Sequence, residues 1–238
     1  MKHRYLDSPA AVGLATLLAL SLASGGSLAQ EKIQAPAPGV PEIYTIQGEF
    51  VRVAYNNEGY VSLGYRVANQ SAGEEWMLLE IGLTVLQGQK DFLLKRDGLS
   101  LSTPDGKTIP LPSNLDFRGA GLQGLEMRAK MVTDSINYFP PSASRACRIG
   151  FFAELDNRAK SYDQVELSPQ RACLGRIYFK VPGGIQHGQH FLNVQFENSQ
   201  VRAPFRILTK EEEKMFNKQW KDIKKELDQA FKETAQKK

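Results

Sequence analysis

The chain contains 238 residues, of which 42% are hydrophobic and 24% are charged, with a formal net charge of +4 at pH 7. This length suits one sizeable domain with appendages. The 30 basic and 26 acidic residues are nearly balanced and interspersed along the chain. This balance argues against a nucleic-acid-binding protein.

The first 29 residues have the pattern of a secretory signal peptide. Lys2 and Arg4 form a basic start, residues 10–23 are apolar, and small residues at Ser27 and Ala29 suit cleavage after Ala29. The apolar run is short for a membrane span, which needs about 20 residues. We therefore expect a secreted or periplasmic protein. An uncleaved anchor or a buried helix is the alternative.

Residues 30–43 read as a Pro-rich linker, because prolines and a glycine are closely spaced there. From residue 44 the hydrophobic period becomes two, which predicts half-buried strands rather than helices. The alternating residues of 60–70 and 75–87 are Val61, Leu63, Tyr65, Val67, Met77, Leu79, Ile81, Leu83 and Val85.

Two hairpins are predicted from turn residues. "NNEG" at 56–59 joins the first two strands, and "TPDGK" at 103–107 joins 98–102 to 107–112. Pro110 and Pro112 confine the last of these segments to a sheet edge.

The segment 113–143 is the least regular part of the chain, and within it 128–139 is expected to form a short helix. Further strands are predicted at 147–155, 162–168, 175–182, 190–196 and 201–208. About ten short strands without alternating helices indicate a mainly β protein, an antiparallel sandwich spanning 44–208.

An amphipathic helix is predicted over 209–238. Thr209 and Glu212 form a capping-box pattern. One apolar stripe, spaced 4, 3, 4 and 4, runs along an otherwise charged helix. Its residues are Phe216, Trp220, Ile223, Leu227 and Phe231. We expect this stripe to pack on its own domain or on a partner, either an envelope protein or a second copy. Membrane-surface contact is disfavoured by the mixed charges.

The two cysteines, Cys147 and Cys173, each lie at the start of a predicted strand. In an exported protein two cysteines usually pair, so we predict a disulfide bond. A free pair is the alternative. A zinc site would need four ligands, and a redox pair would more often be Cys-x-x-Cys.

Two other motifs resemble cofactor or metal sites without their required context. Gly119, Gly121 and Gly124 fit G-x-G-x-x-G, but the preceding segment is a poor strand and no acidic residue follows about 20 positions on. His187 and His190 are read as an exposed turn rather than a metal site. No cofactor and no metal are therefore expected.

Catalytic residues are not singled out by any pattern. Ser62 lies in mid-strand without a G-x-S-x-G elbow. Asn69 opens a formal glycosylation sequon in an expected loop. Aromatic residues are expected in the core, one of each adjacent pair being free for the surface. Scattered carboxylates leave a glycosidase pair open: Glu74, Glu75, Glu80, Asp91, Asp97 and Asp105.

The stretch 173–208 carries Gly175 before "IYFKVP", then a Gly-containing turn, "FLNVQF" and "VRAPFRI". It resembles the closing strands of exported bacterial immunoglobulin-like domains of unknown function. The segment 60–76 resembles the strand of those domains that ends in Asn before a turn. The resemblance covers 45–208 and implies an immunoglobulin-like sandwich without catalytic residues. The segment 113–143 and the terminal helix depart from it.

These patterns favour a non-catalytic binding or assembly module in the cell envelope or outside it. Its expected contact elements are 113–143 and the helix stripe. The alternative is an envelope hydrolase or a carbohydrate-binding protein on a sandwich scaffold. A cleft with two facing carboxylates, or a histidine beside a serine, would favour that alternative.

Overall fold

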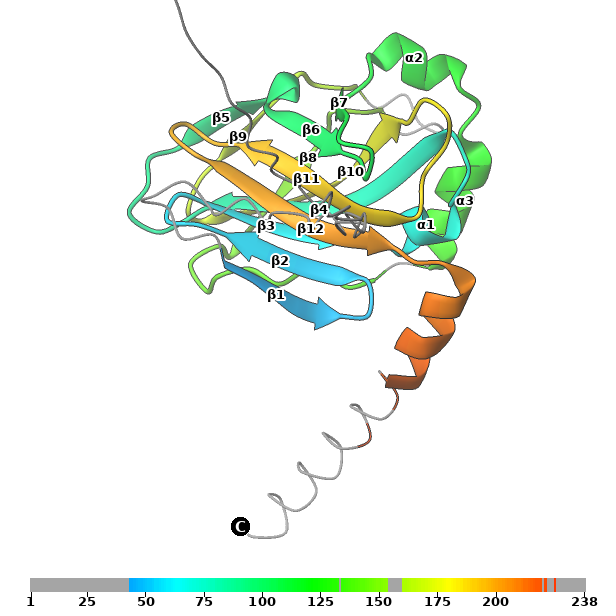
Figure 1. Ribbon diagram of the computed structural model, residues 1–238. Helices are drawn as coiled ribbons and strands as arrows, with labels where there is room; N and C mark the ends of the chain where they lie inside the picture. Colours follow the sequence, from blue (N-terminus) through cyan, green and yellow to red (C-terminus); the bar gives the residue numbers. More distant parts are fainter. Residues whose placement is uncertain (1–42, 133, 154–159, 220, 222–224, 226–238) are drawn as a thin grey trace, which may run out of the picture. The chain divides into compact units, whose positions relative to one another are not determined.

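The computed structural model describes residues 43–132, 134–153, 160–219, 221 and 225 (Figure 1). The expected signal peptide at 1–29 and nearly all of the expected linker lie outside the described residues. The first strand, β1, begins at Ile43, the last residue of that linker range.

The larger sheet has six strands in the order β1-β2-β3-β4-β10-β8. Neighbours pair antiparallel except β8 and β10, which run parallel. The wholly antiparallel sandwich expected from the sequence is therefore wrong at this edge. The strands are β1 Ile43–Gly48, β2 Val51–Tyr55, β3 Gly59–Gly64, β4 Trp76–Val85, β8 Arg145–Ile149 and β10 Arg171–Lys180.

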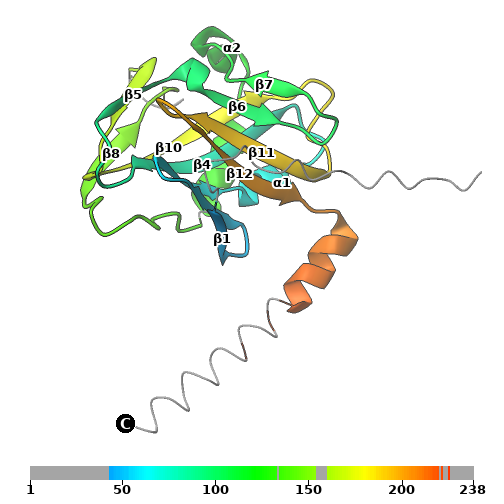
Figure 2. The same cartoon turned by 60° about the vertical axis from the view of Figure 1, so that its left-hand side comes forward.

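A four-stranded antiparallel sheet has the order β12-β11-β6-β7, and β12 contacts β2 and β3 of the larger sheet (Figures 1 and 2). A separate pair joins β5 to β9. The bounds are β5 Phe92–Lys95, β6 Leu99–Ser102, β7 Thr108–Pro110, β9 Gln164–Leu167, β11 Gly188–Gln195 and β12 Gln200–Ile207. A one-turn 3-10 helix, Arg96–Gly98, precedes β6.

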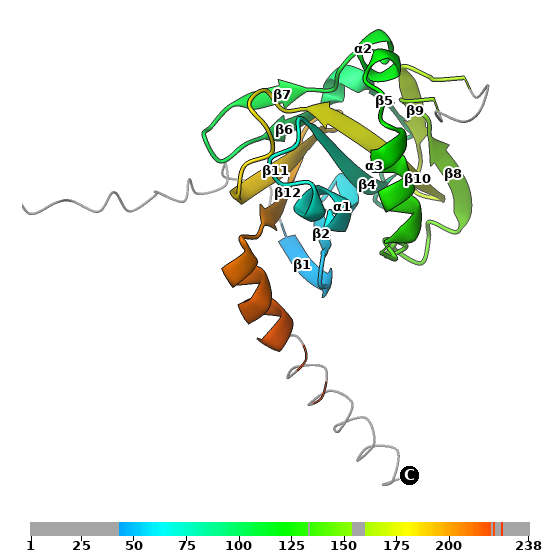
Figure 3. The same ribbon diagram turned by 90° about the vertical axis from the view of Figure 1, so that its right-hand side faces the viewer.

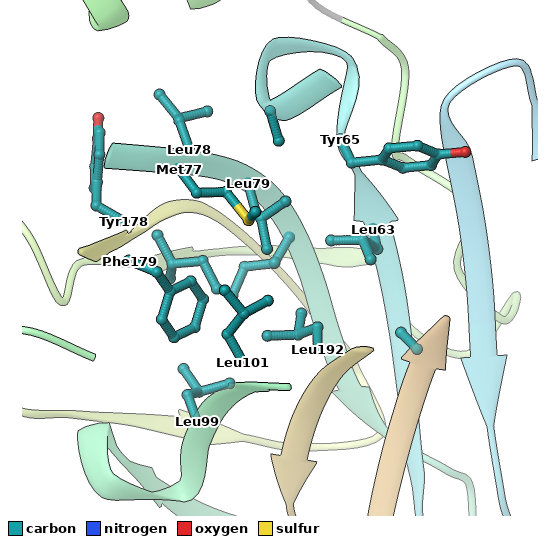
Figure 4. Close-up of a cluster of buried hydrophobic side chains, with 14 of the residues drawn as sticks. Leu63, Tyr65, Met77, Leu78, Leu79, Leu99, Leu101, Tyr178, Phe179 and Leu192 are labelled. Atoms are coloured by element: carbon teal, nitrogen blue, oxygen red, sulfur yellow. The ribbon is translucent and has the colours of Figure 1, made fainter. Parts of the chain in front are cut away.

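The main core lies between the two larger sheets, which gives the sandwich-like arrangement that the period-two pattern predicts. In β12 the pattern holds strictly: Val201, Ala203, Phe205 and Ile207 are buried, and the residues between them are exposed or half-buried. Buried side chains from both sheets meet in one cluster (Figure 4): Leu63, Met77, Leu79, Leu99, Leu101, Phe179 and Leu192.

Strand β4 differs from the expectation, because all ten of its residues are buried. Met77, Leu79 and Ile81 face the predicted core, but the opposite face is covered as well. A Cβ at Gly82 would come within 2.7 Å of the Phe139 ring. The half-buried interpretation of this strand is therefore wrong, since a period-two pattern does not reveal a cover contributed by a distant segment.

The cover comes from 113–143, which contains helices α2, Asn114–Gly119, and α3, Gln123–Met131. Figure 3 shows α3 lying beside β4 and β10. The helix expected at 128–139 is wrong for its second half, because 134–139 has no regular structure. There the chain follows the sheet, and the Ser62 hydroxyl donates to the Ile136 carbonyl at 2.8 Å.

The strand expected to continue through 65–70 is also wrong, because helix α1 occupies Arg66–Gln70. Tertiary contacts favour this single turn over the local alternation. The Asn69 side chain accepts a hydrogen bond from Leu208 N at 2.7 Å, and the Arg66 guanidinium holds Asp134 at 2.9 Å. Asn69 is 7% exposed, so the sequon does not lie in an open loop.

Both predicted hairpins are confirmed. Between β2 and β3, the Asn56 side chain accepts hydrogen bonds from the backbone of Glu58 and Gly59, each at 2.8 Å. Between β6 and β7, Gly106 has a φ of 81°, which favours glycine. Strand β7 lies at a sheet edge and contains Pro110, as a residue without a backbone N–H requires.

Candidate functional site

The predicted disulfide bond is confirmed between Cys147 and Cys173, which are 26 residues apart in the sequence. The two cysteines stand opposite each other in the register of β8 and β10. Strand β8 is the edge strand, and most of its side chains are exposed or half-buried. The bond therefore ties a weakly buried edge strand to its inner neighbour β10, which in turn pairs with β4.

The C-terminal helix begins at Lys210, directly after β12. The predicted capping box is confirmed: Thr209 Oγ1 accepts from Glu212 N at 3.2 Å, and Thr209 N donates to Glu212 Oε2 at 2.9 Å. These bonds satisfy the backbone N–H groups of Thr209 and Glu212 at the start of the helix. They fix the point at which the helix begins after β12.

The first residue of the predicted stripe, Phe216, is half-buried and contacts the ring of Phe50, with centroids 6.3 Å apart. The Arg66 guanidinium lies 4.5 Å from the centroid of the Phe50 ring and also donates a hydrogen bond to Asp134. The stripe thus starts against the sandwich. Its other residues, Trp220, Ile223, Leu227 and Phe231, lie outside the described residues.

The glycine motif at 119–124 does not form a dinucleotide site. Gly119 ends α2, Gly121 has a φ of 65° in the turn, and Gly124 lies in α3. The motif thus joins two helices, whereas a phosphate-binding turn joins a strand to a helix.

His190 is fully buried in β11, so the expectation of an exposed turn is wrong for it, although His187 is exposed. The His190 ring stacks on Phe205, and Nδ1 donates to the Gly188 carbonyl at 3.1 Å. Nε2 has no partner among the described residues. Burial lowers the pKa of His190 below its ordinary 6.5, against smaller opposing effects of the Gly188 carbonyl and Asp105.

We predict that acid weakens the fold through His190. The unfolded chain binds this proton near pH 6.5, whereas the folded chain binds it only at lower pH, so stability is complete above 6.5 and falls as the pH drops below it. Urea unfolding from pH 8 to pH 5 measures this loss. Between pH 8 and pH 5, the free energy of unfolding of His190→Phe is expected to fall less than that of the wild type. The free energy of unfolding of His187→Gln is expected to fall as much as that of the wild type. Parallel losses in all three would contradict the assignment.

The scattered carboxylates are mostly engaged in ion pairs. Arg176 contacts Glu80 at 3.3 Å, Arg128 binds Glu74 at 2.8 Å, and Lys107 contacts Asp105 at 2.6 Å. Burial raises the pKa of Glu80, against the effect of Arg176. In each of these pairs a carboxylate faces a basic side chain, whereas a glycosidase needs two carboxyl groups that face each other across a cleft.

The part of the chain that the structure describes contains no cluster of three or more His, Cys, Asp or Glu side chains placed to hold a metal ion. It also contains no helix with the length and hydrophobicity of a membrane span.

Two of the adjacent aromatic pairs lie wholly in the core, because Phe151, Phe152, Tyr178 and Phe179 are at most 6% exposed. In the third pair, Tyr138 is 36% exposed and Phe139 is half-buried, so the expectation that one member is free for the surface holds only there. The cover formed by 113–143 buries the outward-facing members: Phe117 lies 4.8 Å from Phe152 and 4.7 Å from Tyr178, between ring centroids.

One pocket, of about 300 Å³, lies between α3, β8 and β10. Its lining is mixed: Ile149, Phe152 and Leu174 are apolar, and Lys130 and Arg148 are charged. The buried Tyr178 hydroxyl donates to Glu126 Oε1 at 3.1 Å, which links β10 to α3. The Tyr178 hydroxyl and the Glu126 carboxylate therefore have a structural role, because their hydrogen bond joins α3 to β10.

A second hollow, of about 320 Å³, lies beside the start of β4 and is called the Trp76 groove below. It is lined by the side chain of Trp76 and by parts of the α2–α3 turn. No feature of the sequence pattern indicated it, because its residues come from segments about 45 positions apart. Its lining is Glu74, Glu75, Trp76, Gly121, Leu122, Gly124, Leu125 and Arg128.

Four large hydrophobic side chains of the segment 113–143 are exposed: Leu115 at 83%, Met127 at 56%, Met131 at 80% and Tyr138 at 36%. Met127 and Met131 lie one turn apart on α3. The four are the exposed large hydrophobic side chains of the segment that the sequence suggested as a contact element.

Comparisons with known protein families, curated proteins and solved structures find no match to this chain.

Proposed function

We propose that this protein is an exported, non-catalytic assembly module, in which a disulfide-stabilised β-sandwich presents the C-terminal helix for pairing with a second copy. The observation that carries the proposal is the fixed start of this helix. The capping box sets where the helix begins, and the Phe216–Phe50 contact places the first residue of the stripe against the sandwich.

Export is supported by two independent features. The first 29 residues have the basic, apolar and small-residue regions of a signal peptide. The Cys147–Cys173 bond, in register between neighbouring strands, belongs to the kind of disulfide that persists in oxidising compartments. We infer a periplasmic or secreted location from the two together.

The sandwich is proposed to be immunoglobulin-like on the resemblance of 173–208 to exported domains of that kind. Two packed sheets with β10, β11 and β12 in sequence are compatible with it. The parallel β8–β10 pair, the separate β5–β9 pair and the helical cover depart from a minimal domain. They represent additions to such a sandwich.

Self-association is supported by the shape of the stripe. Spacings of 4, 3, 4 and 4 give a narrow seam of the kind that pairs with another helix, whereas binding at a membrane surface needs a broader apolar face. Three heptads give a weak coiled coil on their own. The ring of Phe216 packs on Phe50, which is 2% exposed, so the start of the proposed seam is anchored on the sandwich.

Replacing Leu227 by Glu should therefore dissociate the assembly, because it places a charge in the seam. Lys225→Glu is the matched control, since it changes charge on the polar face of the predicted helix. Sedimentation velocity of the mature chain should give a dimer or larger species for the wild type and Lys225→Glu, and a monomer for Leu227→Glu. A monomeric wild type at about 100 μM, where even a weak dimer forms, would contradict the proposal.

A further inference from the structure

Strand β1 forms an open edge of the six-stranded sheet. Among the described residues it pairs with β2 alone, and this pairing is regular up to Ile46, after which the register shifts. Beyond the shift, the Gln47 carbonyl accepts a hydrogen bond from the Tyr138 hydroxyl at 3.4 Å. An edge strand presents a row of backbone N–H and C=O groups to which another strand can add. The regular stretch 43–46 is therefore a template for a further strand.

This edge differs in composition from the others. The three described sheets have six edge strands, and proteins usually protect such strands with charged residues or proline. Strand β1 has the sequence IYTIQG and contains neither. Each of the other five contains at least one: Arg145 and Arg148 in β8, Pro110 in β7, Arg202, Pro204 and Arg206 in β12, Lys95 in β5 and Glu166 in β9.

The open stretch also carries an exposed apolar side chain. Ile46 is 59% exposed. Of its neighbours, Thr45 is half-buried and Gln47 is exposed, and neither is charged. An uncharged edge with an exposed apolar side chain favours association with another strand.

The β1 edge lies near the start of the C-terminal helix. Phe50, two residues after the end of β1, contacts Phe216 of the helix with ring centroids 6.3 Å apart. Figures 1 and 3 show β1 on the side of the sandwich from which this helix leaves. The edge is therefore adjacent to the surface proposed above for the pairing of two copies.

The charges favour a second copy as the partner of this edge. Two β1 strands meet without a charged side chain on either of them. Pairing β12 with itself about Pro204 would place Arg202 of one copy opposite Arg206 of the other. Like charges in opposite positions destabilise a sheet. Strand β1 is therefore the edge that suits pairing with itself.

We propose that β1 pairs antiparallel with β1 of a second copy, so that the two six-stranded sheets form one continuous sheet across a two-fold axis. In such a pair one residue stands opposite its own counterpart. This residue is Thr45, because a centre there brings Ile46 of both copies into the pairing. A pairing of about four residues is small beside the roughly 1,200 to 2,000 Å² of a stable interface. The proposal therefore rests on the proposed function, in which the helix supplies further surface.

Cross-linking of the mature Thr45→Cys chain tests the pairing directly. Opposite residues of an antiparallel pair have Cα atoms about 4.5 to 5.5 Å apart, which lies within the range of a disulfide bond. Mild oxidation should link most chains into dimers that a reducing agent separates. Thr108→Cys is the matched control, because Thr108 is an exposed threonine on the edge strand β7. It should give several-fold less cross-linked dimer.

A charge introduced at Ile46 tests the same pairing without an added cysteine. Ile46→Lys should weaken dimerisation about tenfold or more, because it brings like charges together across the edge. Leu93→Lys makes the same kind of change at a 44% exposed position on the edge strand β5, and should weaken dimerisation less than about twofold. An equimolar mixture of Ile46→Lys and Ile46→Glu should regain most of the lost affinity. Sedimentation equilibrium measures these affinities, and the melting temperatures should stay close to that of the wild type because both positions are exposed.

The outcomes separate this proposal from the helix pairing. If Leu227→Glu dissociates a wild-type dimer while Thr45→Cys and Thr108→Cys cross-link equally, the β1 pairing alone is overturned. Equal effects of Ile46→Lys and Leu93→Lys would also overturn it. A dimer that persists without residues 209–238 and that Ile46→Lys dissociates would support the β1 pairing and reject the helix pairing. A monomeric wild type at about 100 μM would reject both.

Discussion

Replacing Cys147 and Cys173 with alanine is expected to lower the free energy of unfolding by about 3 to 4 kcal/mol. The bond closes a loop with a sequence separation of 26, and a cross-link of that length removes this much chain entropy from the unfolded state. For a domain of this size the melting temperature should fall by about 7 to 14 °C. Urea unfolding of the oxidised wild type and the double variant measures the difference.

Reduction provides the matched control for this substitution. A reducing agent should destabilise the wild type by a similar amount and leave the double alanine variant unchanged, because Cys147 and Cys173 are the only cysteines. Two titratable thiols in the unreduced mature protein would contradict the bond. Equal unfolding free energies of the wild type and the double variant would show that the bond does not stabilise the domain.

Leu78→Ala and Leu79→Ala are each expected to cost about 2 to 5 kcal/mol, although the two side chains point to opposite faces of β4. Leu78 is 1% exposed and Leu79 is fully buried. Leu79 packs in the core between the sheets, and Leu78 lies on the face opposite to it (Figure 4). Denaturant unfolding of both variants tests whether both faces of the larger sheet are covered.

Leu115→Ala serves as the comparison for these two variants, because Leu115 is 83% exposed on α2. It should change the free energy of unfolding by less than about 0.5 kcal/mol. If Leu78→Ala were as mild as Leu115→Ala, the second face of β4 would be open, and the helical cover would be wrong.

The sequence pattern was informative where local chemistry decides the structure. The hairpins follow from Asn56 and Gly106, whose side chain and positive φ make the turns. The alternation in 200–207 predicts the single buried face of β12, because the side chains between the buried ones remain exposed or half-buried. Thr209 and Glu212 are three residues apart, so their reciprocal bonds are also a local property.

The errors arise where distant segments decide the structure. The alternation through 60–70 continues past Gly64, but contacts of Arg66 with Asp134 and of Asn69 with Leu208 N favour a helical turn. The burial of His190 depends on Phe205 of the neighbouring strand. A hydrophobic period reports on one segment and carries no information about its partners.

The candidate sites follow the same division. The disulfide bond was predictable because only two cysteines exist and each lies at the start of a predicted strand; in the structure each is the third residue of its strand. The Trp76 groove was not, because Glu74 and Arg128 meet only after α3 packs beside β4. Gly121 and Gly124 were visible as a motif, but the sequence does not show that they line one hollow together with Trp76.

The most direct test of the proposed assembly is the solution mass of the mature chain with and without residues 209–238. Strand β12 ends at Ile207, so the cut preserves the sandwich and removes the capping box with the stripe. Sedimentation equilibrium is expected to give a dimer or larger species for the full mature chain and a monomer for the shortened one. If the full and the shortened chains formed particles with the same number of copies, the account would be contradicted.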